Sequence, residues 1–479
     1  MPWDSKQPST NDRNSHLKSV LRFFAAGPDA PPITDAAQVD QLYRHHRRSV
    51  IFIIVFAYGL GYVCRLALNV VKKPLMDAGV FTPEEVGFIG SMLLYGYAFG
   101  KFSNGFLADY SNVKRFFAVG LLLSASLNFG MSFSTVVGLS AILWLLNGWS
   151  QGFGAPACAV ALASWFSNHE RGRYYGIWST AHSIGEGMTY LGVAFLLALP
   201  PKGLGLSWQW GFWIPAIVCV FAALLVLRML QDRPQTLGLP AVAEWKHDGR
   251  AVARPGSHVA ASIWKDQLKV LTIPAIWVIA LASSSMYITR YAVNSWGNVY
   301  LQEIRGFDLF DANLFIFMNT AAGILGCVAY GYISDKWFDA RRPPANVLFG
   351  LMELIPLFVI FYGPANSVVL AIALVVYGFG LSGILASLGG LFAIDIAPKK
   401  VAGAAMGFIG VFSYVGAGMQ DYISGKLIYD SEIRVVFSAG EYTPTVFFYD
   451  YTVPIMFWVG ASVVSFLLAA SLWKVRASD

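Results

Sequence analysis

The apolar residues of this chain gather in twelve long segments, and this pattern limits the possible folds more than any other feature of the sequence. A helix needs about 20 mostly apolar residues to cross the roughly 30 Å hydrocarbon core of a bilayer. Segments of that kind begin near residues 49, 85, 114, 137, 174, 209, 272, 308, 345, 366, 400 and 452. The sequence therefore predicts an all-α membrane protein with twelve transmembrane helices.

The composition agrees with lipid as the solvent for most of the chain. Of the 479 residues, 56% are hydrophobic and 13% are charged, too few charges to cover an ordinary water-soluble surface. The formal net charge of +6 does not indicate nucleic-acid binding, because the basic residues lie between apolar runs and form no basic domain. The sequence shows no metal cluster and no nucleophile with a base at plausible spacing. We therefore expect no enzyme activity, metal site or cofactor.

A polar stretch rich in Pro and charge, from about Gln231 to Lys265, divides the segments into two sets of six. We expect an N-terminal segment at 1–48, a six-helix bundle at 49–230, a linker at 231–270 and a second bundle at 271–479. The first forty-odd residues contain no apolar run. The sequence thus predicts no cleavable signal peptide, and the first apolar helix directs insertion.

The basic residues of the short loops set the predicted orientation. Short cytoplasmic loops carry an excess of Lys and Arg. Basic residues precede the first segment and follow the even-numbered segments, at Arg44, Arg47, Arg48, Lys114, Arg115, Arg171, Arg173, Lys336, Arg341, Arg342, Lys399 and Lys400. We therefore expect a multi-pass protein of the cell (cytoplasmic or inner) membrane with both termini and the linker in the cytoplasm. The exceptions on the other side are Lys72, Lys73, Lys202 and Arg305.

An internal repeat with an offset of about 225 residues relates the two sets of segments. The pattern Y-x-x-R-x-A-x-N occurs at residues 62–69 and again at 287–294. Two further motifs recur in the same order: G-x-x-x-D at Gly105 and Asp109 and at Gly331 and Asp335, and Gly-Phe-Gly at 152–154 and at 378–380. The chain is thus a tandem duplication of a six-helix unit. Parallel repeats of this kind are typical of major facilitator transporters, whose substrate sites lie near the membrane midplane between the halves.

Arg65 and Arg290 occupy corresponding positions in the two copies of the repeat. An Arg at the centre of a membrane helix costs roughly 2.5 to 3.5 kcal/mol, so it should face a polar cavity or a partner. If both line the interface between the halves, their guanidinium groups converge on one point and match the oxygens of a phosphate in bidentate fashion. The alternative is that each Arg pairs with an internal carboxylate or caps a helix end.

Other polar residues in apolar surroundings are candidates for the same site. Tyr62 and Tyr287 stand three residues before each Arg, with Tyr58 one turn further back, and can hydrogen-bond a phosphate or a sugar hydroxyl. Their alternative role is packing. Lys101 either contributes charge to the site or extends to the cytoplasmic face. His182 either follows the charge of a bound phosphate or is a neutral core histidine.

Glu186 lies four residues after His182 and shares its helix face. It can neutralise a cationic group, carry a coupled proton, or form a structural ion pair. The loop motifs Gly105 to Asp109 and Gly331 to Lys336 are expected to set helix packing at the cytoplasmic ends and so to report the fold.

From about Thr34 to the last helix, the sequence resembles the organophosphate:phosphate antiporters of the major facilitator superfamily. The resemblance rests on several short stretches. These are Asp232-Arg233-Pro234-Gln235 followed by Gly238-Leu239-Pro240, Asn147 through Pro156, Glu170-Arg171-Gly172, Ala181-His182 and Ser334-Asp335-Lys336. The stretches around residues 40–44 and 244–248 look most like the hexose-phosphate transporter and sensor branch.

The resemblance implies twelve helices and a phosphate held by Arg65 and Arg290, with exchange of an organic phosphate for inorganic phosphate. It implies supporting roles for Lys101, His182, Tyr58, Tyr62, Tyr97, Tyr287 and Tyr414. Asn294, which ends the second copy of the repeat, is included in the predicted binding site.

The sequence departs from the family pattern at several positions near the predicted site. Leu66 stands where the family commonly has Lys and Ser295 where it has Asp, so both members of a potential ion pair are absent. Thr320 replaces an acid and Glu186 replaces a Gly, while Ile384-Leu385-Ala386 replaces a stretch with Gly-Pro. We predict that Glu186 supplies a counter-charge for Lys101.

The leading functional hypothesis is exchange of a phosphorylated hexose, or a similar small organophosphate, for inorganic phosphate by alternating access. The predicted partners are thus an organophosphate, inorganic phosphate and membrane lipid, without nucleic acid. One alternative is a transporter-like receptor that binds hexose phosphate and signals to a membrane kinase. Another is proton-coupled symport of an organic anion, suggested by Glu186.

Overall fold

The computed structural model describes residues 23–25, 27–246, 269–339, 341–364, 366–396, 402–436 and 445–475. The central part of the predicted linker and the basic residues Lys399 and Lys400 lie outside these ranges. In the described ranges almost all regular structure is helical, and the helices correspond in order and position to the twelve predicted segments.

The helices of the first half form one bundle. They are α2 (Ala36–Asp77), α3 (Pro83–Tyr110), α4 (Val113–Met131), α5 (Val137–Gln151), α6 (Gly154–Trp165), α7 (Asn168–Met188), η1 (Thr189–Val193), α8 (Ala194–Leu197) and α9 (Trp210–Met229). The helices of the second half form another. They are α12 (Pro274–Tyr291), η4 (Ala292–Trp296), α13 (Gly297–Glu303), α14 (Leu309–Trp337), α15 (Arg342–Tyr362), α16 (Ser367–Ala386), η5 (Ser387–Leu391), α17 (Phe392–Ile396), α18 (Ala402–Asp430) and α19 (Thr452–Ser471).

Several of the predicted membrane segments consist of more than one helix. The fourth is divided into α5 and α6 at Gly152, and the fifth, seventh and tenth each contain a π-helical turn, at η1, η4 and η5. Within the described ranges, seven helices are long and apolar enough to cross a membrane by length and composition alone. Helix α7 is not among them, because Glu170, Arg171, Arg173, His182 and Glu186 make it unusually polar.

Glycines of the repeated Gly-Phe-Gly motif allow close helix packing in both halves. A Cβ atom on Gly152 would lie 2.5 Å from the carbonyl carbon of Gly100 on α3. In the second half, a Cβ on Gly378 would lie 2.0 Å from the carbonyl oxygen of Asn319 on α14. Small residues let membrane helices approach closely in this way. The repeat in the sequence thus corresponds to equivalent helix contacts in the two bundles.

Two elements at the ends of the bundles lie outside the predicted helical segments. A two-stranded antiparallel hairpin, β1 (Glu432–Val436) and β2 (Thr445–Tyr449), lies between α18 and α19 with Glu432 opposite Tyr449. At the other end, the first part of the linker forms η2 (Pro234–Leu237) and α10 (Val242–Trp245) and folds back onto α2. The Trp245 ring stacks on Tyr43 at 4.1 Å, and the Tyr43 hydroxyl donates to the Pro240 carbonyl.

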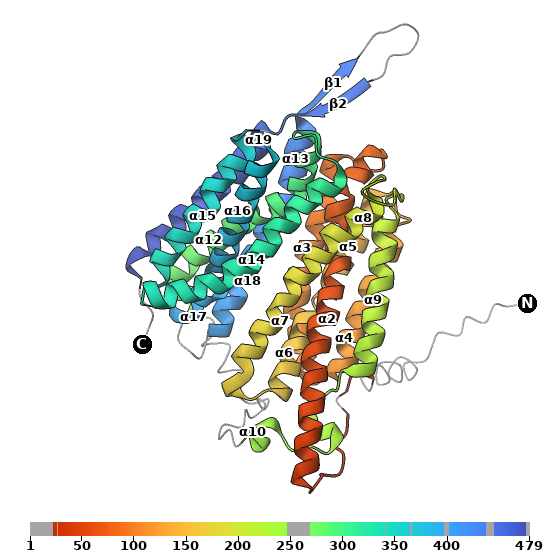
Figure 1. The fold of residues 1–479 in the computed structure, drawn as a ribbon, viewed down its shortest axis with the longest axis vertical. Helices are drawn as coiled ribbons and strands as arrows, with labels where there is room; N and C mark the ends of the chain where they lie inside the picture. Colours follow the sequence, from red (N-terminus) through yellow and green to blue (C-terminus); the bar gives the residue numbers. More distant parts are fainter. Residues whose placement is uncertain are drawn as a thin grey trace, which may run out of the picture.

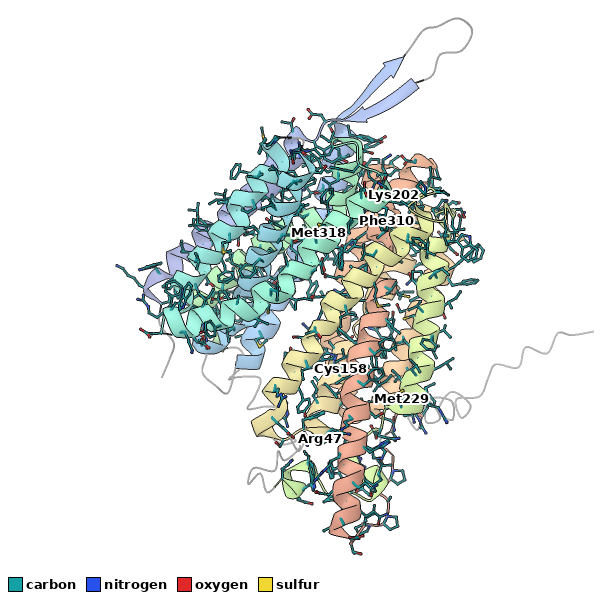
Figure 2. The ribbon with its side chains drawn as sticks, viewed as in Figure 1. Arg47, Cys158, Lys202, Met229, Phe310 and Met318 are labelled. Atoms are coloured by element: carbon teal, nitrogen blue, oxygen red, sulfur yellow. The ribbon has the colours of Figure 1, made fainter. Side chains whose placement is uncertain are left out.

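We call the end that carries α10 the linker end and the end that carries β1 and β2 the hairpin end (Figure 1). The two bundles run side by side near the hairpin end, and α17 and α7 lie apart at the linker end (Figure 1). Figure 2 labels Lys202 and Phe310 near the hairpin end and Arg47 near the linker end. Within the described ranges, the hydrogen bonds and ion pairs that join the halves lie between the centre and the hairpin end.

Candidate functional site

A small central pocket brings the two repeat-related arginines together. Arg65 comes from α2 in the first half and Arg290 from α12 in the second, and both line the same space. The free volume between them is about 20 Å³, which holds a water molecule but not a sugar phosphate. A larger ligand would therefore have to displace the side chains around it. The residues that line the pocket are Tyr62, Arg65, Leu66, Asn69, Glu186, Tyr190, Arg290, Tyr291, Asn294 and Tyr414.

Arg65 is held by aromatic rings. Its side chain is 4% exposed, and its guanidinium carbon lies 3.7 Å from the ring centroid of Tyr97 on α3 and 5.7 Å from that of Tyr414 on α18. One guanidinium nitrogen also lies 3.4 Å from the Tyr62 hydroxyl oxygen. Among the described residues, no carboxylate pairs with Arg65. Stacking on an aromatic face stabilises a desolvated cation by about 2 kcal/mol. An aromatic ring supplies no negative charge, however, so the positive charge of Arg65 has no counter-ion among the described residues.

Arg290 has a different partner from its repeat equivalent. Its Nη2 lies 2.9 Å from Oε1 of Glu186 on α7, so an ion pair joins the two halves. The prediction that Glu186 is a counter-charge for Lys101 is therefore wrong, because its carboxylate contacts Arg290. The rings of Tyr287 and Tyr291 lie 5.8 and 5.9 Å from the guanidinium carbon. The pocket thus contains two guanidinium groups and one carboxylate, with one formal positive charge in excess.

π-helical turns lie on both sides of this pocket. In η1, the hydroxyl of Tyr190 donates to the backbone carbonyl of Asn294 in η4 at 2.7 Å. The side-chain oxygen of Asn294 in turn accepts from Asn319 on α14 at 2.8 Å. π-Helical turns are rare and occur frequently at functional sites. Here they place residues of both halves against each other beside the arginines.

His182 and Lys101, two further residues of the predicted site, lie near the arginines. His182 lies 5.3 and 5.2 Å from the rings of Tyr58 and Tyr62, and its Nδ1 is 2.8 Å from the Ser179 carbonyl, so it belongs to an aromatic cluster in the first half. Lys101 is exposed toward the linker end, with its Nζ 6.0 Å from the ring of Tyr414.

The rings of Tyr97 and Tyr287 both pack against Tyr414, at 4.9 and 5.5 Å. Tyr414 therefore links aromatic residues of the two halves beside the arginines. Arg65, Arg290 and Tyr414 are the predicted residues that the structure places in one pocket together with Tyr62, Glu186 and Asn294. Lys101 and His182 lie beside this pocket rather than in its lining.

The residues of the loop motifs lie near the linker end, away from the pocket. Asp335 pairs with Arg342 at 2.8 Å, and the same Arg342 reaches Asp395 at 2.6 Å, so this contact joins α14, α15 and α17. A Cβ atom on Gly105 or Gly331 would meet nothing within 4 Å. Lys336 is exposed beside the ring of Tyr332. The side chain of Asp109 lies outside the described part of the structure.

A second buried ion pair joins the halves nearer the hairpin end, and none of its residues belongs to the predicted site. Lys72 on α2 is fully buried, and its Nζ lies 2.5 Å from Oδ1 of Asp421 on α18 and 2.6 Å from the Ser295 hydroxyl. Trp296 donates its indole hydrogen to the same carboxylate oxygen at 2.7 Å. We call Lys72, Asp421, Ser295 and Trp296 the lysine cluster.

The basic residues that were exceptions to the predicted charge bias all have partners in the structure. Lys73 pairs with Asp77 and lies 3.8 Å from Glu303, while Lys202 lies 2.6 Å from both Asp308 and Asp311. Arg305 donates to backbone carbonyls at the end of α15. Together with Lys72, these lysines of the first half face carboxylates of the second half. Opposite charges therefore meet along the hairpin end of the interface.

The sequence contained a signal for one residue that the predicted site omitted. Asn69 ends the first copy of the repeat, as Asn294 ends the second, and both line the pocket. The backbone carbonyl of Asn69 accepts from Asn298 at 2.7 Å, so this residue also contributes to the contact between the halves. Tyr190 and Tyr291 had no comparable signal, because neither has an aromatic counterpart in the other copy.

The chain matches known proteins over most of its length. The model of the Major Facilitator Superfamily matches residues 48–420. The membrane sensor protein UhpC of Salmonella typhimurium is 33% identical, with 85% of this chain and 91% of the relative covered. A probable hexose phosphate transport protein of Chlamydia pneumoniae is 32% identical, covering 85% and 90%. The glycerol-3-phosphate transporter of Bacillus subtilis is 34% identical, covering 83% and 89%.

The fold also matches solved transporter structures. A bacterial homologue of the human lysosomal transporter Spinster, in an inward-facing and unoccupied conformation, superposes with a TM-score of 0.69 at 14% identity. The match covers 90% of this chain and 99% of that one. At this identity the likeness concerns the fold alone. The family match and the curated relatives identify the chain as a multi-pass membrane protein of the organophosphate:phosphate antiporter family in the major facilitator superfamily, a family of transporters and not of enzymes.

Proposed function

We propose that the protein exchanges a phosphorylated hexose, or a similar small organophosphate, for inorganic phosphate by alternating access. One observation carries the proposal: guanidinium groups from both halves line one central pocket that holds a single carboxylate. An oxyanion that enters this pocket gains charge-assisted hydrogen bonds to Arg65 without displacing any carboxylate from it. Its phosphate is therefore the part of the substrate that both halves recognise.

Arg290 and Glu186 give the binding step a second component. A phosphate that binds Arg290 must compete with the carboxylate of Glu186, which lies 2.9 Å away. Once the phosphate takes this place, the Glu186 carboxylate is repelled and the ion pair between the halves opens. Binding of the anion thus changes the contacts between the halves, as a ligand must if it is to shift a conformational equilibrium. Inorganic phosphate and the phosphate group of an organic substrate can each open this ion pair. Exchange requires that both can do so.

The lysine cluster supplies the opposing constraint. It buries an ion pair between α2 and α18 and keeps the hairpin end closed. In alternating access, this contact must separate when the central site opens toward the hairpin end. With the linker end facing the cytoplasm, as the basic loops predict, the hydrogen bonds and ion pairs that join the halves lie between the centre and the outer end. Substrate of either kind would then enter and leave the site past Lys101.

Exchange in reconstituted vesicles tests the proposal. Purified protein is placed in vesicles loaded with unlabelled inorganic phosphate, and uptake of labelled glucose 6-phosphate and glycerol 3-phosphate is measured. We expect uptake that requires internal phosphate and that needs a much higher phosphate concentration in Arg65→Lys. Absence of exchange with any organophosphate would contradict the proposal. Uptake driven by a pH gradient without internal phosphate would instead favour proton symport.

A receptor is the second candidate, because one relative is a membrane sensor protein at 33% identity. A receptor would use the same arginines to bind hexose phosphate and would pass the signal to a membrane kinase. Binding and flux separate the two functions. Tight binding of hexose phosphate by purified protein, with negligible exchange in vesicles, would identify a receptor. Binding together with sustained exchange identifies a transporter.

A further inference from the structure

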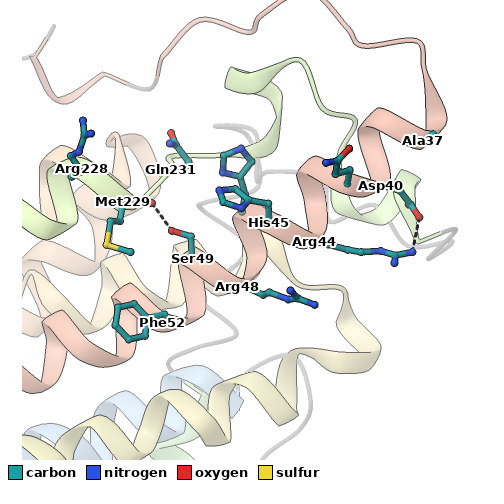
Figure 3. A pocket seen from close by; sticks show the side chains of 12 residues that line it. Ala37, Asp40, Arg44, His45, Arg48, Ser49, Phe52, Arg228, Met229 and Gln231 are labelled. Carbon is teal, nitrogen blue, oxygen red and sulfur yellow. Dashed lines mark hydrogen bonds and ion pairs between the residues drawn. The ribbon is translucent and has the colours of Figure 1, made fainter.

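A second pocket lies at the linker end, remote from the central arginines. It is formed by one face of the first four turns of α2 together with the end of α9, and its volume is about 1010 Å³ (Figure 3). The residues from α2 recur at the three- and four-residue spacing of one helix face. Its lining consists of Ala37, Asp40, Gln41, Arg44, His45, His46, Arg48, Ser49, Phe52, Arg228, Met229 and Gln231.

The charge of this pocket is predominantly positive. Arg44 pairs with Asp40 at 3.1 Å, and the Trp245 indole, which donates to Asp40, holds the pKa of that carboxyl below its ordinary value. Asp40 therefore balances one arginine. Arg48 and Arg228 line the same pocket, and within the described residues neither has an ion pair or a hydrogen bond. Two guanidinium groups, one on α2 and one on α9, are thus available to an anion.

The pocket adjoins the surface that faces lipid. Phe52 is 53% exposed and Phe56 is 36% exposed, and the two rings stack on each other at 5.5 Å. Phe52 lies one turn beyond Arg48, about 6 Å along the helix axis. The exposed Leu227 precedes Arg228 on α9. Along this face, the cations are therefore followed directly by exposed apolar side chains.

We propose that this pocket binds the phosphate headgroup of an anionic phospholipid, with the acyl chains lying along Phe52 and Phe56. Basic pockets at helix ends are suited to such headgroups, and the arrangement of cations above exposed aromatics matches both parts of a lipid. A soluble phosphate would use the arginines but would gain nothing from the aromatic pair. The two arginines lie on either side of the contact in which the Ser49 hydroxyl donates to the Met229 carbonyl at 3.1 Å (Figure 3).

Lipid retention measured by native mass spectrometry tests the proposal. Purified protein in detergent is mixed with equal amounts of phosphatidylglycerol and phosphatidylcholine. We expect wild type to retain phosphatidylglycerol in preference to phosphatidylcholine. Arg48→Gln and Arg228→Gln should each lower that preference roughly five-fold, because one basic residue near the headgroups contributes about 1 kcal/mol of lipid attraction. Arg173→Gln removes an exposed arginine from another helix at the same end and should leave the preference unchanged.

Two further measurements make the result decisive. The double variant Arg48→Lys with Arg228→Lys preserves the charge and should keep most of the preference, which excludes loss of folding as the cause. Excess inorganic phosphate should not displace the lipid. Displacement by phosphate would overturn the lipid assignment in favour of a soluble anion. Equal retention of the two lipids by wild type, or unchanged preference in both Arg48→Gln and Arg228→Gln, would overturn the pocket itself.

Discussion

Arg65 and Lys72 are buried cations on the same helix, two turns apart, yet their surroundings are opposite in kind. Arg65 is held by the ring of Tyr97 and has no carboxylate partner among the described residues. Lys72 has the carboxylate of Asp421, the hydroxyl of Ser295 and the ring of Trp296. The protein therefore supplies a carboxylate for Lys72 and, among the described residues, none for Arg65.

This difference in partners distinguishes Arg65, the cation proposed to bind the ligand, from Lys72, whose ion pair is proposed to hold the hairpin end closed. A fully paired buried charge gains nothing from a further anion, whereas a charge that is held only by rings is stabilised when an anion arrives. Arg290 is intermediate, because its carboxylate partner is supplied by the other half. Under the proposed function, phosphate competes with this carboxylate. Along the interface, charge compensation thus increases from the centre toward the hairpin end. The four predictions below test this gradient.

The largest effect is expected from Asp421→Asn. This change leaves Lys72 buried without a counter-charge, which costs about 3 to 5 kcal/mol and destabilises the closed hairpin end. Distances between spin labels at Leu199 and Val453, on a background with Cys327→Ser, report the separation of the halves at that end. The variant should add a population with a longer distance. Lys72→Met combined with Asp421→Leu replaces the pair by apolar residues and should restore the shorter distance. If wild type, Asp421→Asn and this double variant all show the shorter distance, the ion pair does not hold this end closed.

Arg65→Lys is expected to have the next largest effect. The change keeps the positive charge but loses the planar fork and its stacking on Tyr97. Two charge-assisted hydrogen bonds to phosphate contribute about 3 kcal/mol together, so phosphate affinity should fall about a hundred-fold. Arg290→Lys should cost less, because a Lys still pairs with Glu186. Half-saturation of phosphate exchange in vesicles measures both, and equal losses would contradict the distinction between the two arginines.

The sequence was sufficient to predict the fold and the meeting of the arginines, because both follow from periodic signals. Twelve apolar segments determine the helices, and a duplicated unit places equivalent residues on opposite sides of one axis. Arg65 and Arg290 line one pocket for this reason. Their role in binding phosphate stays a prediction, as do the supporting roles of Lys101 and His182 and the domain boundaries.

Partners across the interface could not be predicted in this way. Glu186 meets Arg290 and not Lys101 because the pairing depends on how α7 is rotated against the second half, which no local spacing encodes. In the sequence, Lys72 stood out as an exception to the charge bias, because its partner Asp421 is 349 residues away along the chain. The β-hairpin escaped prediction for a different reason: its strands are five residues each, too short to stand out beside long apolar segments. Short β-branched and aromatic runs flanking Gly440 were the available signal.

Glu186→Gln should have an intermediate effect of the opposite sign. Removal of the carboxylate frees Arg290, so phosphate no longer competes with it, and phosphate should bind about ten-fold more tightly, equivalent to about 1.4 kcal/mol. The unpaired Arg290 should also lower the unfolding temperature of the protein without phosphate, and added phosphate should restore it. Thermal unfolding with and without phosphate measures both effects. Weaker phosphate binding in this variant would mean that Glu186 supports the ligand and does not compete with it.

The smallest effect is expected from Tyr97→Phe, and its small size is informative. The ring face of Tyr97 holds Arg65, so loss of the hydroxyl alone should change phosphate half-saturation by less than about two-fold. Tyr97→Leu instead removes the ring and with it about 1 to 2 kcal/mol of stacking. Leu should therefore weaken exchange roughly ten-fold. A matched change at Tyr291→Leu should matter less, since its ring lies 5.9 Å from a guanidinium that already has a carboxylate. A large loss with Phe would show that the Tyr97 hydroxyl contacts the phosphate, so that Arg65 is not held by stacking alone.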